Sequence, residues 1–168
     1  MTAQATETLH YRGRMLPLCT EPLAPYLKTG QPRIGLRGTC SACWRGYVGE
    51  WEIEDRRLYL VGLSDPWGND SDLTLAALFP GDADGVFAHW YSGELRCWLG
   101  RELEYVHGGY GSTYECDLYL LIEGGVLTGE RLVFNDSELP DVTADQRDVA
   151  AVVEALGSWS PRSAVAAK

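Results

Sequence analysis

The stretch Gly46-Tyr47-Val48-Gly49-Glu50-Trp51-Glu52-Ile53-Glu54 decides the fold class. Apolar or small residues alternate along it with residues that are mostly Glu, which is typical of an antiparallel strand with one buried face. The alternation places 47, 49, 51 and 53 on the inner face and 50, 52 and 54 on the outer face. Polar residues 54–57 then predict a turn, and 58–63 (LYLVGL) predict the returning strand. The stretch therefore predicts a β-hairpin.

A second segment, Gly109-Tyr110-Gly111-Ser112-Thr113-Tyr114-Glu115, aligns with the first without a gap. Gly, Tyr, an aromatic residue and Glu coincide, and a Leu-Tyr-Leu follows each copy, at 58–60 and 118–120. The predicted faces also agree, because Tyr47 and Tyr110 lie on the inner face of their strands and the two glutamates, Glu52 and Glu115, lie on the outer face. We interpret this similarity as an internal duplication; the alternative is two hairpins that share one β-propensity pattern.

These patterns predict a mostly-β fold, either an antiparallel sandwich or a partly open barrel, with one C-terminal α-helix. The chain of 168 residues favours a single domain. We place the domain at 9–157, its two halves at about 9–63 and 86–135, and the helix at about 143–157, with Asp141 or Thr143 as its cap. Residues 1–8 and 158–168 are expected to be flexible.

The charge balance limits the kinds of partner. The formal net charge is −10, and the longest basic run is Arg56-Arg57. Nucleic acids and anionic membrane surfaces require positive charge on the protein, so we expect neither as a partner. A basic protein partner is favoured, because opposite fields speed encounter. The simpler alternative is that the charge only keeps the protein soluble.

The N-terminal sequence predicts a cytoplasmic location. MTAQATETLHYRGR lacks the basic and apolar regions of a signal peptide, and no apolar run approaches 18 residues. In the cytoplasm the five cysteines are expected to be reduced thiols.

Cys40-Ser41-Ala42-Cys43 has the spacing of half a zinc site. A structural zinc site needs a second pair of ligands, and the sequence has no second motif of this kind. We therefore expect no metal and no cofactor, and we interpret these cysteines as buried or incidental thiols.

Three segments resemble an uncharacterised bacterial protein family. They are 43–53 (CWRGYVGEWEI), 86–95 (VFAHWYSGEL) and 105–115 (YVHGGYGSTYE). The resemblance extends over roughly residues 9–135 and implies no activity. Small bacterial proteins of this kind often neutralise a toxin, and this analogy supplies the hypothesis of an immunity protein.

The leading hypothesis is a non-enzymatic protein that binds another protein. Six Trp and nine Tyr against three Phe favour recognition surfaces, because these rings carry a polar tip. The alternative is that the same rings pack in the core. The candidate binding residues are Trp44, Arg45, Tyr47, Trp90, His107 and Tyr110.

A small hydrolase, perhaps acting on a carbohydrate-like substrate, is the alternative function. It requires the carboxylates of Glu52 and Glu115 to converge, with His107 as a general base. The opposing interpretation is two solvated glutamates, and no nucleophile elbow or phosphate loop supports an enzyme. A module that dimerises through a sheet edge is a third hypothesis.

Overall fold

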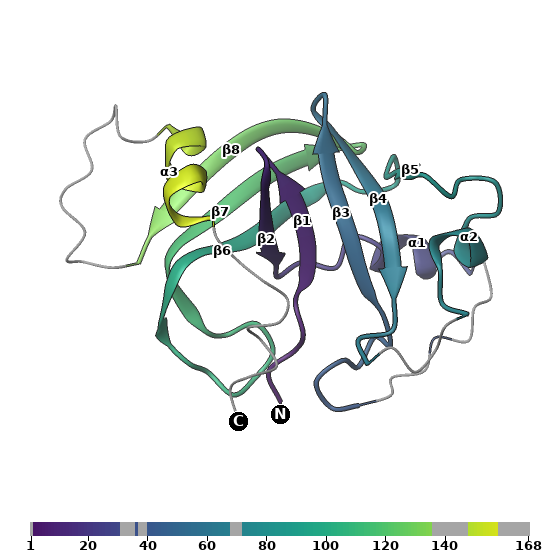
Figure 1. Ribbon diagram of the computed structural model, residues 1–168, viewed down its shortest axis with the longest axis horizontal. Helices are drawn as coiled ribbons and strands as arrows, with labels where there is room; N and C mark the ends of the chain where they lie inside the picture. Colours follow the sequence, from purple (N-terminus) through teal and green to yellow (C-terminus); the bar gives the residue numbers. More distant parts are fainter. Residues whose placement is uncertain (1, 31–35, 37–39, 68–71, 136–147, 158–168) are drawn as a thin grey trace.

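The computed structural model describes residues 2–30, 36, 40–67, 72–135 and 148–157, and shows a mostly-β protein (Figure 1). About half of it is strand and an eighth is helix, at 48% and 12%. The elements in chain order are β1 (Glu7–Tyr11), β2 (Arg14–Leu18), α1 (Ala24–Leu27), β3 (Val48–Glu54), β4 (Arg57–Ser64), α2 (Leu75–Leu78), β5 (Val86–Phe87), β6 (Gly93–Glu104), β7 (Thr113–Glu123), β8 (Val126–Phe134) and α3 (Val149–Leu156).

Seven of the strands form a closed barrel. Their order is β3-β1-β2-β6-β7-β8-β4, and the pairing of β3 with β4 closes the ring. The two alternatives drawn from the sequence, a sandwich and a partly open barrel, were therefore wrong. The sheet is also not purely antiparallel, since β1 runs parallel to β3. Pairings between strands distant in the chain decide closure, and local alternation carries no information about them.

Two pairings in the ring have a single residue pair in register, β2 with β6 and β4 with β8. In the second of them this pair is Arg57 and Val126. The extra strand β5 then replaces β8 as the neighbour of β4, pairing with Tyr59 and Leu60. The backbone of Gly125 lies at this junction, where it accepts from Leu58 N at 2.8 Å and donates to Tyr91 O at 2.8 Å. Arg56 also joins the two strands, since its carbonyl accepts from Leu127 N at 2.7 Å and its Nη2 donates to the Leu127 carbonyl at 2.6 Å.

The β3–β4 hairpin forms as its alternation predicts. Trp51 is 0% exposed inside the barrel, and the glutamates of β3 lie on the outer face. The turn is tighter than expected, because it consists of Asp55 and Arg56 with φ of 46° and 63°. Two residues with positive φ match the right-handed twist of the flanking strands.

The β7–β8 hairpin also follows its predicted pattern. Cys116, Leu118, Leu120 and Ile122 are 0% exposed and face the interior. The strands are joined at Gly124 and Gly125, and β8 returns over the predicted residues. Leucines dominate the barrel core, and each one that is fully buried contributes about 1.5–3 kcal/mol.

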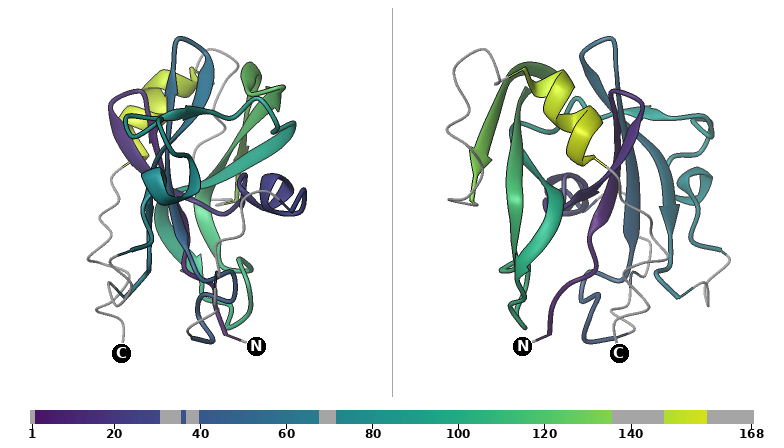
Figure 2. Two further views of the ribbon diagram at one scale, coloured as in Figure 1. Left: turned by 90° about the vertical axis from the view of Figure 1, so that its right-hand side faces the viewer. Right: turned by 60° about the vertical axis from the view of Figure 1, so that its left-hand side comes forward.

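The C-terminal helix α3 lies within the predicted range, at Val149–Leu156. It begins after Asp148, whose carboxylate accepts from Ala150 N at 3.1 Å, and ends at Gly157 as expected. The caps proposed at 141 and 143 lie outside the described residues. Val153, 0% exposed, joins the barrel core, and the helix lies beside β8 and the β1–β2 hairpin (Figure 2). Arg14 of β2 donates to the Glu154 carbonyl at 3.2 Å, which fixes this placement.

Candidate functional site

The N-terminal segment and two loops meet at one end of the barrel. Gln4 N donates to Gly109 O at 2.9 Å, in the loop between β6 and β7. Ala5 N donates to Ala42 O at 2.7 Å, in the turn before β3. Residues 2–6 therefore tie together loops that are far apart in the sequence. We call this region the loop end of the barrel (Figure 1).

A buried carboxylate lies under the loop end. Glu7 shares the inner face of β1 with Leu9 and Tyr11 and is 0% exposed. Its Oε2 accepts from Trp51 Nε1 at 2.5 Å. A Cβ at Gly49 would lie 2.6 Å from both Glu7 Oε2 and Trp51 Nε1. The absence of a side chain at position 49 is thus what allows this hydrogen bond.

Arg45 connects Glu7 to the loops. Its side chain is 7% exposed, and Nε lies 3.1 Å from Glu7 Oε1, although the two are not aligned for a hydrogen bond. Nη1 donates to the Tyr110 hydroxyl at 3.0 Å, and Nη2 donates to the Ala5 carbonyl at 2.9 Å. The guanidinium also lies over the Tyr47 ring, 5.5 Å from its centroid. One cation therefore bridges the barrel interior, the N-terminal segment and the β6–β7 loop.

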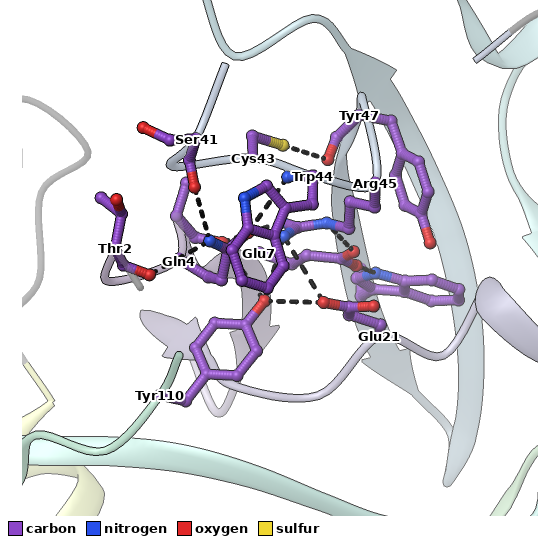
Figure 3. Close-up of polar contacts among 12 residues, drawn as sticks. Thr2, Gln4, Glu7, Glu21, Ser41, Cys43, Trp44, Arg45, Tyr47 and Tyr110 are labelled. Atoms are coloured by element: carbon purple, nitrogen blue, oxygen red, sulfur yellow. Dashed lines mark hydrogen bonds and ion pairs between the residues drawn. The ribbon is translucent and has the colours of Figure 1, made fainter. Parts of the chain in front are cut away.

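Tyr110 extends the network to Glu21, which follows β2. The Tyr110 hydroxyl donates to Glu21 Oε1 at 3.0 Å while it accepts from Arg45 (Figure 3). Arg45 Nη1 is itself 3.6 Å from the same carboxylate oxygen. We call Glu7, Glu21, Arg45, Trp51 and Tyr110 the buried network.

Burial dominates the electrostatics of this network. It raises the pKa of Glu7 from 4.5 to about 7, against the opposing effects of Arg45 and of the hydrogen bond from Trp51. It also raises the pKa values of Tyr47 and Tyr110 far above the ordinary range, so both hydroxyls keep their protons. Glu7 has no exposed surface, whereas the Glu21 side chain is 35% exposed. The geometry of the network suits the ordering of loops.

Three aromatic side chains stand exposed on the loops of this end. Trp44, Trp67 and Tyr105 are 57%, 51% and 58% exposed, and we call them the aromatic rim. The Trp44 backbone N–H donates to Gln4 Oε1 at 3.1 Å, and Trp67 Nε1 donates to Cys40 Sγ at 3.1 Å. Large exposed rings on anchored loops are typical of recognition surfaces.

The structure brings together four of the candidate binding residues: Trp44, Arg45, Tyr47 and Tyr110. His107 lies in the same loop as Tyr110, and its Nδ1 is 3.0 Å from the Tyr105 hydroxyl.

Trp90 lies apart from this group. Its ring packs on those of Tyr26 and Phe79, with centroids at 4.7 and 5.7 Å, and its Nε1 donates to the Pro22 carbonyl at 2.9 Å. Its contacts are those of a packing residue.

Glu52 and Glu115 are not brought together. Glu52 is exposed on the outer face of β3. Glu115 lies on β7, where it accepts from Arg101 N at 2.8 Å and pairs with the Arg101 guanidinium at 3.2 Å. Two strands, β8 and β4, separate β7 from β3 by the shorter way around the barrel, and outward side chains on a closed ring diverge. The arrangement gives no support to the paired carboxylates that the hydrolase hypothesis requires.

Sequence reasoning missed Glu7, Glu21, Trp67 and Tyr105. A signal existed for Glu7, because Glu7, Leu9 and Tyr11 alternate and place a carboxylate on the inner face of an apolar strand. The polar composition predicts a flexible terminus over residues 1–8, whereas Glu7 and Thr8 belong to β1. For Glu21, Trp67 and Tyr105 no local pattern distinguishes a site residue from an ordinary loop residue.

Metal-binding clusters and membrane-spanning helices are absent from the described part of the chain. No group of three or more His, Cys, Asp or Glu side chains there is placed to hold a metal ion. None of the helices described is long and apolar enough to cross a membrane. Comparisons with protein-family models, with curated proteins and with solved structures found no match.

Proposed function

We propose that this chain is a non-enzymatic binding protein whose recognition surface is the loop end of the barrel. The observation that carries the proposal is the aromatic rim, Trp44, Trp67 and Tyr105, exposed beside a buried network that holds the supporting loops. Binding energy at interfaces is concentrated in a few large aromatic and Arg side chains.

The buried network supports this proposal through preorganisation. Ordering loops on binding costs free energy, and loops already held in place avoid that cost. Arg45 and Tyr110 link the N-terminal segment, the turn before β3 and the β6–β7 loop with side-chain hydrogen bonds of 2.9–3.0 Å. A rigid scaffold that presents exposed rings suits a protein partner.

The partner class we propose is a basic protein, and the specific role is immunity against a bacterial toxin. The net charge of −10 supports a basic partner, because complementary fields steer encounter. A cytoplasmic location is part of this proposal, since an immunity protein protects the cell that makes it.

The test is binding to the proteins encoded by the adjacent genes, measured by calorimetry with purified components. Trp44→Ala and Trp67→Ala are each expected to weaken binding at least about tenfold, because each removes a large exposed ring from the surface. The matched control is Leu121→Ala, another exposed apolar residue, 41% exposed on β7. It is expected to bind as wild type does.

Two results would overturn the proposal. One is wild-type affinity in both tryptophan variants, and the other is an equal loss in Leu121→Ala. The immunity role has its own test: co-expression with a toxic neighbour-encoded protein is expected to restore growth, and the double tryptophan variant is expected to fail. Absence of rescue by the wild-type chain would exclude that role.

We also propose that the two hairpins derive from an internal duplication. Gly46 and Gly109 both have positive φ, 78° and 57°, directly before the matching tyrosines. Both tyrosines contact Arg45, one through its ring and the other through its hydroxyl. Equivalent positions of the two segments thus meet in one site, which is what a duplicated unit arranged around a shared axis would produce.

A further inference from the structure

Cys40 and Cys43 close a tight turn beside the aromatic rim. Cys43 N donates to Cys40 O at 3.2 Å, and the two residues pair as an isolated antiparallel bridge. Cys40 Sγ accepts from Trp67 Nε1 at 3.1 Å, and Cys43 Sγ donates to the Tyr47 carbonyl at 3.3 Å. Both sulfurs therefore contact residues of the loop end.

The backbone of this turn suits a disulfide. The first and fourth residues of a β-turn have Cα atoms less than about 7 Å apart. Disulfides form across Cα separations of about 4.4–6.8 Å. The turn thus holds the two backbones in a range that a bridge can span, once the side chains rotate from their present contacts toward each other.

Solvent access distinguishes Cys40 from the other cysteines. Cys40 is partly exposed, whereas Cys19, Cys43, Cys97 and Cys116 are buried. An external oxidant therefore meets Cys40 first, and Cys43, its neighbour in the turn, is placed to react second.

We propose that Cys40 and Cys43 form a reversible disulfide that regulates the loop end, the regulatory part resting on the proposed binding function. The oxidant class is a low-molecular-weight disulfide. The Cys40 thiolate attacks one sulfur of this disulfide and expels one thiolate, which takes up a proton. The Cys43 thiolate then attacks Cys40 Sγ and expels the second. Two protein thiols and one disulfide thereby become one protein disulfide and two small thiols.

The disulfide changes the contacts of the rim. Cys43 loses its S–H and so can no longer donate to the Tyr47 carbonyl. Cys40 Sγ turns toward Cys43 and away from the Trp67 indole, which loses the hydrogen bond that anchors it. Burial raises the pKa of the Cys43 thiol, so its attack on Cys40 Sγ quickens as the pH rises.

The test exposes the wild-type chain to mixtures of oxidised and reduced glutathione. Intact mass is expected to fall by about 2 Da, the loss of two hydrogens, and dithiothreitol is expected to reverse the change. Both cysteines fall in the tryptic peptide 38–45 (GTCSACWR), so the bridge maps to one peptide. Absence of this bridge at every glutathione ratio, or a bridge mapped elsewhere, would overturn the proposal.

Two variants sharpen the assignment. Cys40→Ser is expected to abolish the loss of mass, and Cys19→Ser is expected to retain it. Cys19 is the matched control because it neighbours Cys97 inside the barrel, which makes that pair the competing site. A persistent loss in Cys40→Ser would exclude the assignment, and the wild-type peptide map decides the matter independently of how the variants fold.

Binding measured on the reduced and oxidised chains separates the two claims. Oxidation is expected to weaken binding about tenfold, because Trp67 is released from its anchor. Equal affinity in the two forms would overturn the regulatory part and leave the binding function standing. A bridged chain for which neither form binds a neighbour-encoded protein would overturn the binding function and leave the modification site standing.

Discussion

Tyr47 and Tyr110 occupy matching places in the two similar segments, but their hydroxyls meet different surroundings. The Tyr110 hydroxyl bonds Arg45 and Glu21, each at 3.0 Å. The Tyr47 hydroxyl is buried and has no hydrogen-bond partner among the residues described. A buried hydroxyl without a partner costs free energy, and one with two charged partners stabilises the fold.

Replacement by phenylalanine tests this difference. Tyr110→Phe is expected to lower the free energy of unfolding by about 1–3 kcal/mol, because it leaves Arg45 and Glu21 without their shared partner. Tyr47→Phe, the matched control, is expected to change it by less than about 0.5 kcal/mol, or to raise it. Urea unfolding of both variants at pH 7 measures the effect, and equal losses would contradict it.

Glu7 is the second residue whose environment sets a measurable property. Its pKa is raised from 4.5 to about 7, so between these values the folded chain holds a proton that the unfolded chain releases. The contribution of Glu7 to the free energy of unfolding is therefore largest below pH 4.5. It decreases as the pH rises from 4.5 toward 7 and is constant above pH 7.

Glu7→Gln removes the carboxyl group that binds this proton. The wild-type chain is expected to lose about 2 kcal/mol more between pH 5 and pH 7.5 than the variant does, because this range covers most of the interval between the two pKa values, at 1.36 kcal/mol for each pKa unit. Urea unfolding at several pH values measures the slope. Glu52→Gln, an exposed carboxylate on the outer face of β3, is the control and is expected to keep the wild-type slope. An unchanged slope in Glu7→Gln would show that Glu7 does not titrate in this range.

The sequence predicts whether a residue is buried where this depends only on the face of the strand on which the residue lies. Trp51 and the glutamates of β3 lie as their alternation predicts. The prediction fails where exposure depends on distant neighbours. Trp51 lies between two glutamates in an alternating strand, whereas Trp67 lies between Pro66 and Gly68, where no alternation predicts which way its ring faces. Trp67 is 51% exposed because the rest of the fold leaves its ring uncovered.

At the scale of elements, the junction of β4, β5 and β8 is a closely packed point of the ring. A Cβ at Gly125 would lie 2.7 Å from the Ala88 carbonyl oxygen and 2.8 Å from Phe87 Cε2. At neighbouring Gly124 a Cβ would meet nothing within 4 Å. Both glycines have positive φ, 80° at Gly125 and 54° at Gly124. A side chain at either position would therefore strain the backbone, but only a side chain at Gly125 would also clash with neighbouring atoms.

Alanine at each position separates these two costs. Gly124→Ala is expected to lower the free energy of unfolding by about 1–2 kcal/mol, the cost of a left-handed conformation. Gly125→Ala is expected to lose about 1–3 kcal/mol beyond that, because its methyl group clashes with backbone that cannot move away. Thermal and urea unfolding of the two variants provide the comparison, and equal losses would indicate that the junction yields freely.

Elements with a local signal were predictable, and their assembly was not. The two hairpins and the C-terminal helix follow from period-2 and period-3.6 patterns. The parallel pairing of β1 with β3 joins strands separated by β2 and a long connection, and no local pattern encodes it. The sandwich and the closed barrel share the same alternation, so the sequence did not distinguish them.

For the whole molecule, the excess of acidic side chains affects association more than folding. The chain has 24 Asp and Glu against 14 Lys and Arg. The electric field of this negative charge extends over about 10 Å at 0.1 M salt, and added salt screens it further. The proposed basic partner would therefore approach faster than an uncharged one at low salt.

Ionic strength tests that steering. The association rate constant with the partner is expected to fall at least about tenfold between 20 mM and 500 mM salt, while the dissociation rate constant changes little. Stopped-flow or surface-plasmon measurements at several salt concentrations separate the two. A flat association rate would show that the acidic charge serves solubility and not encounter.

The order of strands around the barrel differs from the order in which the ribosome makes them. β1 and β2 emerge first, but their outer neighbours are β3 and β6, and the ring closes only when β8 meets β4. A nascent chain that ends before Val126 therefore carries open strand edges, which attract other chains and protein-quality-control factors. A premature stop before the codon of Val126 would thus yield a fragment marked for aggregation or degradation, and not a smaller working protein.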